Sequence, residues 1–261
     1  NDLNTLRLVA SRAYRMPSFH EQYAYSKLWL TAAPAIQQTI ADNRNANKTI
    51  KPENLTTYEV GFLSASEDNM LSLDVRLFHE ELRDYIYPLD YDCVMVPGAQ
   101  CTAGTDVEVH ENVGWMDING VELQTRVQLG ENTTLTQAAS LAKAEGRRLE
   151  DYYNGGGLGY DRMSKSLPNV TLSTMLQHRF KNGIEASLTH YRMSEMEWPR
   201  EGTDLPGYHR YDLRAAKSIK VGDSKITGEI ILQNFTGDDY YEFSGNNRFE
   251  PRSYFRLTVD L

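Results

Sequence analysis

The sequence predicts an all-β fold, an antiparallel transmembrane β-barrel of about ten strands. Apolar and polar residues alternate in many segments, which places successive side chains on opposite faces of a strand. Short turns also alternate with long polar connections along the chain. No run reaches the roughly 18 to 20 apolar residues that a membrane helix needs, and the mean hydropathy is only -0.55. A low mean is typical of barrels, because only every second residue of a strand faces lipid.

The alternation is clearest where apolar residues are interleaved with charged ones. In segment 71–77, leucine and valine at the odd positions are separated by Ser72, Asp74 and Arg76, and segment 121–129 repeats this pattern. Segments 170–177 and 255–261 alternate in the same way. Together with the turn residues, this pattern predicts strands near 4–15, 55–66, 70–87, 107–129, 133–145, 167–180, 184–196, 208–220, 226–238 and 252–261.

The connections between these strands fall into two classes. Short turns rich in Gly, Asn and Asp are expected at 67–69, 130–132, 181–183 and 222–224. The long polar or aromatic connections are 16–54, 89–106, 147–165, 198–207 and 241–250. This asymmetry is typical of outer-membrane barrels, which have short periplasmic turns and longer outer loops. Several strands exceed the roughly 9 to 11 residues that cross a bilayer, so we expect them to project beyond it on the loop side.

Composition excludes some partners and indicates an oxidising compartment. A net charge of -9 without clustered Lys or Arg excludes nucleic acid as a partner. The spacing of Cys93 and Cys101 suits a disulfide that closes a loop, and two free thiols are the alternative. The chain opens at Asn1 without a leader, so we expect a processed chain or a piece of a longer one.

The sequence indicates no catalytic residue, no metal site and no cofactor. The six histidines are scattered singly, without a nucleophile elbow, and no two of them have zinc-ligand spacing. His178 and His190 fall near strand ends, where an amphipathic ring at the bilayer interface is the ordinary explanation. We interpret the pair Met193 and Met196 as packing residues.

Strand parity assigns charged and aromatic residues to different environments. Charged residues on neighbouring strands should point to a polar interior and form a ladder of opposite charges: Asp74, Arg76, Glu122, Arg126, Asp212, Arg214, Glu229, Arg256 and Asp260. Aromatic residues near strand ends should form an interfacial girdle: Tyr85, Tyr87, Trp115, Tyr208 and Tyr211. Both assignments depend on strands that separate lipid from a polar lumen.

Six segments, in order along the chain, resemble those of TonB-dependent outer-membrane receptors. They are Ser11 to Pro17 with Glu21, Lys51-Pro52-Glu53 with Tyr58 to Gly61, Phe78 to Ile86, Asn112-Val113 with Gly120-Val121-Glu122, Gln233-Asn234-Phe235 to Tyr240, and Pro251 to Tyr254. The resemblance implies that residues 1–261 form the carboxy-terminal portion, the last ten strands, of a 22-stranded barrel in a Gram-negative outer membrane. The plug domain, the TonB box and the first strands would be absent from this chain. The chain ends in Leu261, where the family prefers Phe.

The long connections supply candidate ligand-binding residues. Aromatic rings there could stack on a ligand, and arginines could pair with an anionic chelate. The candidates are Arg15, Tyr23, Tyr25, Trp29, Tyr91, Tyr152, Tyr153, Trp198, Arg200, Tyr240 and Tyr241. The alternative is that these aromatics pack the loops against each other.

The resemblance implies the transport of a scarce nutrient rather than an enzyme. The expected ligand is a metal chelate bound at the outer loops, most commonly a ferric siderophore in this family, with haem, cobalamin, copper and a glycan left open. The implied partners are the TonB complex, acting through the plug, and outer-membrane lipid. Two other interpretations remain: a self-contained ten-stranded barrel with protease-like activity, and a soluble β-sandwich binding module.

Overall fold

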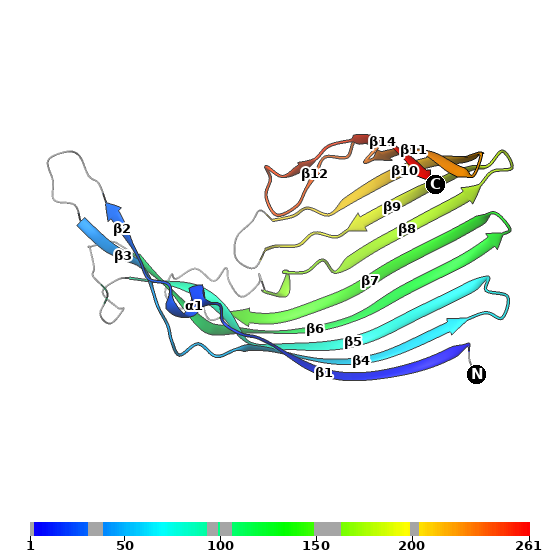
Figure 1. The fold of residues 1–261 in the computed structure, drawn as a ribbon. Coiled ribbons are helices and arrows are strands. Elements are labelled where there is room, and N and C mark those ends of the chain that lie inside the picture. The colour runs from blue at the N-terminus through cyan, green and yellow to red at the C-terminus, as the bar shows by residue number, and fades with distance from the viewer. Residues whose placement is uncertain (1–2, 31–38, 93–98, 100–105, 149–162, 199–203) are drawn as a thin grey trace.

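A computed structural model describes residues 3–30, 39–92, 99, 106–148, 163–198 and 204–261 (Figure 1). Ten strands follow one another in the main sheet, each antiparallel to the next. They are β1 (Asn4–Arg15), β4 (Glu53–Ala65), β5 (Leu71–Asp92), β6 (Asp106–Gly130), β7 (Thr133–Arg148), β8 (Val170–Arg179), β9 (Ile184–Met193), β10 (Tyr208–Val221), β11 (Ser224–Gln233) and β14 (Arg252–Asp260). These are the ten strands that the sequence predicts, with ends that differ by a few residues.

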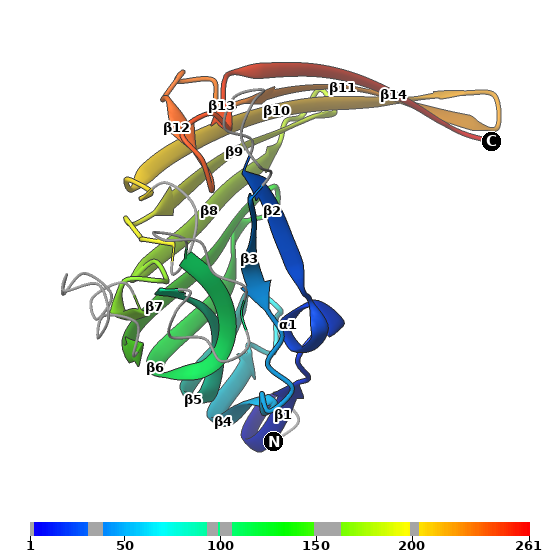
Figure 2. The same ribbon diagram turned by 90° about the vertical axis from the view of Figure 1, so that its left-hand side faces the viewer.

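The sheet is a curved wall with two different ends (Figures 1 and 2). At one end, which we call the turn end, successive strands are joined by short turns and both chain termini lie nearby. At the opposite end, the loop end, they are joined by the long connections. Within the described residues β1 pairs only with β4 and β14 only with β11, so both edges of the sheet are open. None of the described helices is long and apolar enough to cross a membrane.

The residue types in the tight turns explain their backbone conformations. In the turn between β4 and β5, Asn69 adopts a φ of 56°, a conformation that asparagine tolerates better than most residues. Asp68 accepts hydrogen bonds from the hydroxyl of Ser66 and the N–H of Met70. Glycines with positive φ occupy the corresponding turns at Gly183 and Gly222.

The long connections contain more structure than the sequence predicts. Segment 16–54 includes helix α1 (Phe19–Tyr23) and a hairpin of β2 (Ser26–Leu30) and β3 (Thr39–Asn45). A two-stranded sheet of β12 (Tyr240–Tyr241) and β13 (Arg248–Phe249) lies in the connection before β14. These elements are short, and β3 pairs in parallel with the distant β6, so local alternation carries little signal for them.

The connection 89–106 is also shorter than expected, because β5 and β6 extend into it. The loop-end parts of β5 and β6 hold half of the buried apolar residues among those described. Val107 is completely buried, and Tyr87, Leu89 and Val113 form a second small cluster. The core therefore lies at the loop end rather than along the whole wall.

The register confirms that each strand has a polar and an apolar face. Arg76 of β5 lies opposite Glu122 of β6, while Leu77 lies opposite Val121 on the other face. The predicted ladder residues of β10, β11 and β14 fall on the same polar face. Large side chains remain exposed on the apolar face, with Leu8 at 73% and Phe255 at 72%. Such a continuous apolar exterior is typical of a surface that meets lipid.

Candidate functional site

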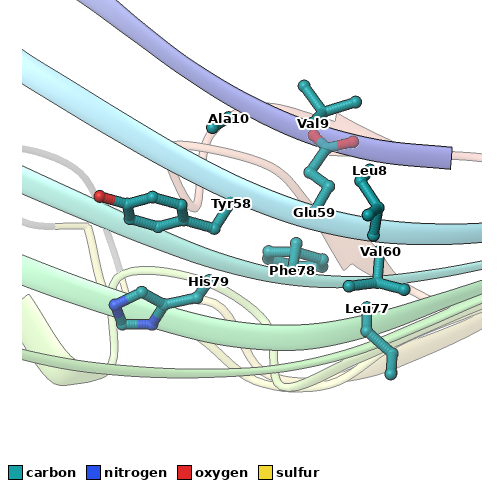
Figure 3. A pocket seen from close by; sticks show the side chains of 9 residues that line it. All are labelled: Leu8, Val9, Ala10, Tyr58, Glu59, Val60, Leu77, Phe78 and His79. Atoms are coloured by element: carbon teal, nitrogen blue, oxygen red, sulfur yellow. The ribbon is translucent and has the colours of Figure 1, made fainter.

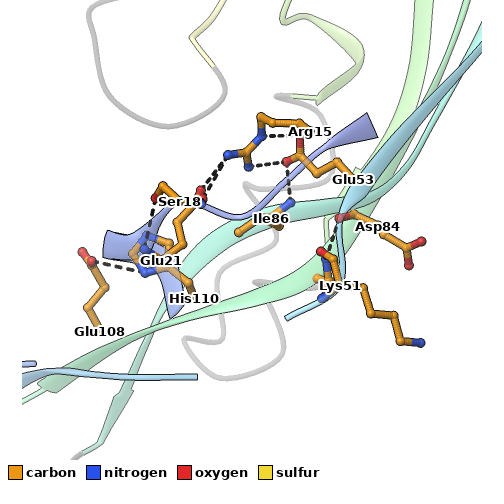
Figure 4. Close-up of polar contacts among 10 residues, drawn as sticks. Arg15, Ser18, Glu21, Lys51, Glu53, Asp84, Ile86, Glu108 and His110 are labelled. Carbon is orange, nitrogen blue, oxygen red and sulfur yellow. Dashed lines mark hydrogen bonds and ion pairs between the residues drawn. The ribbon is translucent and has the colours of Figure 1, made fainter. Parts of the chain in front are cut away.

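At the loop end, Arg15 joins three elements through two carboxylates (Figure 4). Its Nε and Nη2 donate to the two carboxylate oxygens of Glu53 over 2.6 and 2.7 Å, and its Nη1 donates to Glu21 over 3.0 Å. Glu53 also accepts a hydrogen bond of 2.8 Å from the N–H of Ile86. All three guanidinium nitrogens of Arg15 are thus engaged, which gives this residue a supporting role within the described structure.

Helix α1 is attached through its own cap. Ser18 and Glu21 form a capping box, in which the Ser18 side chain accepts from the Glu21 N–H and Glu21 accepts from the Ser18 N–H. Burial raises the pKa of Glu21. The hydrogen bonds from Ser18 and Arg15 together lower it by more than burial raises it, so the net pKa is below its ordinary value. Glu21 therefore favours its ionised form in the folded protein.

A second polar cluster lies beside the first. The side chain of Asn112 accepts from the N–H of Lys51 over 2.8 Å and donates to the Lys51 carbonyl over 2.9 Å. It also donates to the carbonyl of Asp84, which sits at a bulge of β5 with a φ of 58°. We call the set of Arg15, Glu21, Glu53, Asp84 and Asn112 the motif junction, because four segments that carried the sequence resemblance meet in it.

Strand β3 is fastened to the wall near this junction. Arg44 donates to the carboxylate of Glu108 over 2.8 Å, and Asn47 donates to the backbone carbonyl of the buried His110 over 2.9 Å. The ring of His20 packs edge-on against His110, with centroids 5.7 Å apart. These contacts and the motif junction together tie segment 16–50 to β5 and β6.

A rim pocket of about 550 Å³ lies at the loop end between the connections that precede β8 and β10. Its polar lining residues are Ser164, Lys165, Asn169, Glu195, Glu197, Asp204 and Tyr241. Lys165 is paired with Glu197 at 3.1 Å, and the Tyr241 hydroxyl donates to the backbone carbonyl of Asp204 over 3.2 Å. Carboxylates outnumber ammonium groups in this lining, so the pocket favours ligand groups that donate hydrogen bonds.

A stack of three rings lies next to the rim pocket. Tyr240 is only 2% exposed, and its ring lies between Tyr208, at 4.3 Å between centroids, and Phe249, at 5.1 Å. Arg210 donates to the Tyr240 hydroxyl over 3.2 Å. Both ring faces of Tyr240 are therefore covered within this chain.

Those predicted ligand-binding residues that the structure describes do not lie together in one site. Tyr241 lines the rim pocket, Trp198 packs edge-on against Phe243, and Tyr91 packs on the buried Val107 cluster. Tyr23, the last residue of α1, packs against Phe19, and Tyr25, two residues later, is about half exposed. Tyr152, Tyr153, Arg200, the side chain of Trp29, and the predicted disulfide of Cys93 and Cys101 lie outside the described residues. Binding by any of these residues remains a prediction.

The predicted girdle needs correction. Trp115 and Tyr211 lie on the apolar face by register, but Tyr208 lies on the polar face and Tyr87 is buried. Parity could not place Tyr87, because a bulge between Leu82 and Ile86 shifts the register of β5. Tyr208 has the same parity as Asp212 and Arg214 in the unbroken register of β10, so it shares their polar face.

The predicted charge ladder is confirmed at two places on the polar face. Arg76 bridges Glu59 and Glu122, each at 2.9 Å, and so joins β4, β5 and β6. Glu229, 3% exposed, bridges Arg214 at 2.6 Å and Arg256 at 2.8 Å, and so joins β10, β11 and β14. Apart from Tyr241, the polar lining of the rim pocket was not predicted, because isolated polar residues in a long connection carry no periodic signal.

A second hollow, of about 610 Å³, crosses β1, β4 and β5 (Figure 3). Leu8, Val60 and Leu77 line it from the apolar face, and the ring of Tyr58 lies roughly parallel to that of His79. Its lining is mainly apolar, and it lies on the face that would meet lipid. We therefore place the candidate site at the rim pocket.

The two-faced sheet agrees with a comparison of the sequence with protein families. The family model described as "TonB dependent receptor-like, beta-barrel" matches residues 1–250. The chain belongs to this family. No curated protein sequence matches it. Receptor barrels of this family are outer-membrane proteins, in which a polar face lines the lumen and an apolar face meets lipid; we name the two faces of this sheet lumenal and lipid-facing accordingly.

Solved structures of TonB-dependent receptors share the fold. The chain superposes on the ferric-catecholate import receptor Fiu from E. coli K12 with a TM-score of 0.62 and 15% identity, covering 99% of this chain and 33% of Fiu. The siderophore receptor PirA from Pseudomonas aeruginosa superposes with a TM-score of 0.64 and 14% identity, and the match covers 99% of this chain and 40% of PirA. The copper transporter OprC superposes with a TM-score of 0.63 and 18% identity, and the match covers 98% of this chain and 36% of OprC. The chain thus spans between a third and two fifths of the length of these receptors.

Proposed function

We propose that this chain forms the carboxy-terminal wall of a receptor that imports a ferric siderophore across the outer membrane of a Gram-negative bacterium. The charge ladder carries this proposal. On the lumenal face, Arg76 and Glu229 each form ion pairs with two residues of opposite charge, while the opposite face is apolar. A wall of this kind separates lipid from a polar interior large enough for a solute or a plug.

The rim pocket supports a ligand site at the outer end of the wall. Tyr241 offers a ring for stacking, and Glu195, Glu197 and Asp204 offer acceptors to hydroxyl or amine groups of a chelate. Two of the three receptors compared above are named for siderophores or catecholates, which supports that ligand class. Coupling to TonB would act through a plug domain encoded in the remainder of the protein.

The first test is the intact mass of the native polypeptide extracted from outer membranes and identified through a peptide of this chain. The proposal requires a mass well over twice the 29.8 kDa of these residues, because a plug and further strands must accompany this wall. A mass near 29.8 kDa would favour the self-contained small barrel and end the transporter proposal.

The second test measures uptake of radioactive iron as siderophore complexes by cells with and without the full-length gene. We expect deletion to abolish uptake of one complex, and Tyr241→Ala to weaken it. Tyr14→Ala, at a residue 60% exposed on the lipid-facing side of β1, is the matched control and should leave uptake unchanged. Loss of copper or haem uptake instead would overturn the ligand class and keep the transport proposal.

A further inference from the structure

Two histidines that are distant in sequence meet on the lipid-facing surface of the wall. His190 Nε2 lies 2.9 Å from His209 Nδ1, and the two rings are within 5° of parallel with centroids 5.2 Å apart. The register pairs His190 with Tyr211 and Arg192 with His209, so the histidines are diagonal neighbours on β9 and β10. A ring-to-ring hydrogen bond requires that at least one of the facing nitrogens carries no proton.

The pair lies at the edge of the apolar surface on the loop side. The next outward pair toward the turn end is Leu188 with Leu213, both partly exposed and apolar. The ring of Tyr211 stacks on His190 at 4.6 Å and 16°. An aromatic neighbour of mixed polarity is typical of the boundary between hydrocarbon and water. The histidines are therefore placed where water and small ions can reach them.

We propose that His190 and His209 form a two-histidine site for a divalent transition-metal ion such as Cu²⁺ or Zn²⁺. Neutral imidazole nitrogen is a ligand that both ions favour. Zinc–nitrogen bonds of about 2.0 to 2.1 Å place two nitrogens of a tetrahedral ion roughly 3.4 Å apart. The observed 2.9 Å would have to increase by only about 0.5 Å, with a rotation of each ring that turns both lone pairs toward the ion.

The protonation states of the two rings allow a metal ion to replace the hydrogen bond between them. In the ring-to-ring hydrogen bond one facing nitrogen donates and the other accepts. When the ion binds, the donor ring moves its proton to its other nitrogen, so that both facing nitrogens present lone pairs. Water completes the coordination, because no group of three His, Cys, Asp or Glu residues suited to a metal occurs among the described residues. The positive charge of Arg192, opposite His209, repels a metal cation and so lowers the affinity of the site.

The experiment uses the full-length receptor, purified in detergent without a histidine tag and titrated with Cu²⁺. Calorimetry should show a site whose affinity falls at least about tenfold in His190→Gln and in His209→Gln. The electron paramagnetic resonance spectrum of the bound copper should show splitting from two imidazole nitrogens in the parent protein and lose it in both variants.

The matched control is His178→Gln. His178 lies on the same face of β8 near the turn end, beside Phe180 and Thr133, and should not affect the site. Circular dichroism of each variant reports whether the barrel still folds, and the two single variants test the site independently. Equal copper affinity in the parent and both histidine variants would overturn the proposal, as would the absence of binding to the parent. The pair would then be a hydrogen-bonded interfacial contact only.

Discussion

Arg15 and Glu53 form a two-point ion pair that joins the last residue of β1 to the first residue of β4, with N–O distances of 2.6 and 2.7 Å. The Glu53 side chain is 8% exposed, whereas that of Arg15 is 47% exposed. The same carboxylate accepts the N–H of Ile86 on the next strand. One side chain therefore holds three successive strands together at the point where segment 16–50 leaves the wall.

We expect Glu53→Ala to destabilise the barrel by about 1 to 3 kcal/mol, because it leaves the Ile86 N–H without its acceptor and breaks a partly buried ion pair. The measurement is denaturant unfolding of the full-length protein in detergent. Glu145→Ala is the control, since its pair with Lys143 is largely exposed and should contribute no more than about 0.5 kcal/mol. Equal effects of the two variants would contradict the role given to the motif junction.

Phe78 lies over Gly120, and a Cβ at position 120 would be 2.3 Å from the Phe78 ring and 2.9 Å from the Leu141 carbonyl oxygen. We expect Gly120→Ala to cost about 1 to 3 kcal/mol through overpacking. Gly228→Ala, where the added methyl group meets no atom within 4 Å, should have little effect. Combining Gly120→Ala with Phe78→Leu should recover part of the loss. An unchanged unfolding midpoint in Gly120→Ala would show that the ring moves freely away.

The facing of the strands can be tested with adjacent residues of β6. Leu123→Arg should destabilise the barrel by about 2 to 4 kcal/mol if this residue faces lipid near mid-bilayer. Gln124→Arg is the control, because Gln124 lies on the lumenal face beside Asp74 and Glu122. Refolding into lipid vesicles measures both values. Similar costs for the two substitutions would show that the lumenal and lipid-facing sides have been assigned wrongly.

The attachment of α1 should depend on pH through Glu21, whose pKa is lowered in the folded protein. A lowered pKa means that the contribution to stability is present above the ordinary value near 4.5 and is lost as the pH falls through the folded pKa. We expect hydrogen-exchange protection of residues 18–24 to be constant from pH 7 to 5 and to fall at lower pH. Glu21→Gln should have weaker protection at pH 7 and a flatter profile. An identical profile in parent and variant would rule out Glu21 as the titrating group.

Much of the candidate site depended on contacts that no local pattern reports. The segments of the motif junction were recognised from their sequences, but not that Asn112 would clasp Lys51 or that Arg15 would engage two carboxylates. Tyr241 was named as a ligand-binding candidate, whereas its neighbours in the rim pocket were not. The capping box of Ser18 and Glu21 was a readable signal for α1 that strand periodicity obscured.

By itself the sequence determined the ten strands, their order along the wall and the division into a polar and an apolar side. The physical reason is that a strand between lipid and a polar interior must alternate its side chains, and this constraint is local. Only the tertiary structure decided which residues meet across strands, because register depends on every turn and bulge between them. The meeting of His190 with His209, nineteen positions apart in sequence, is one such result.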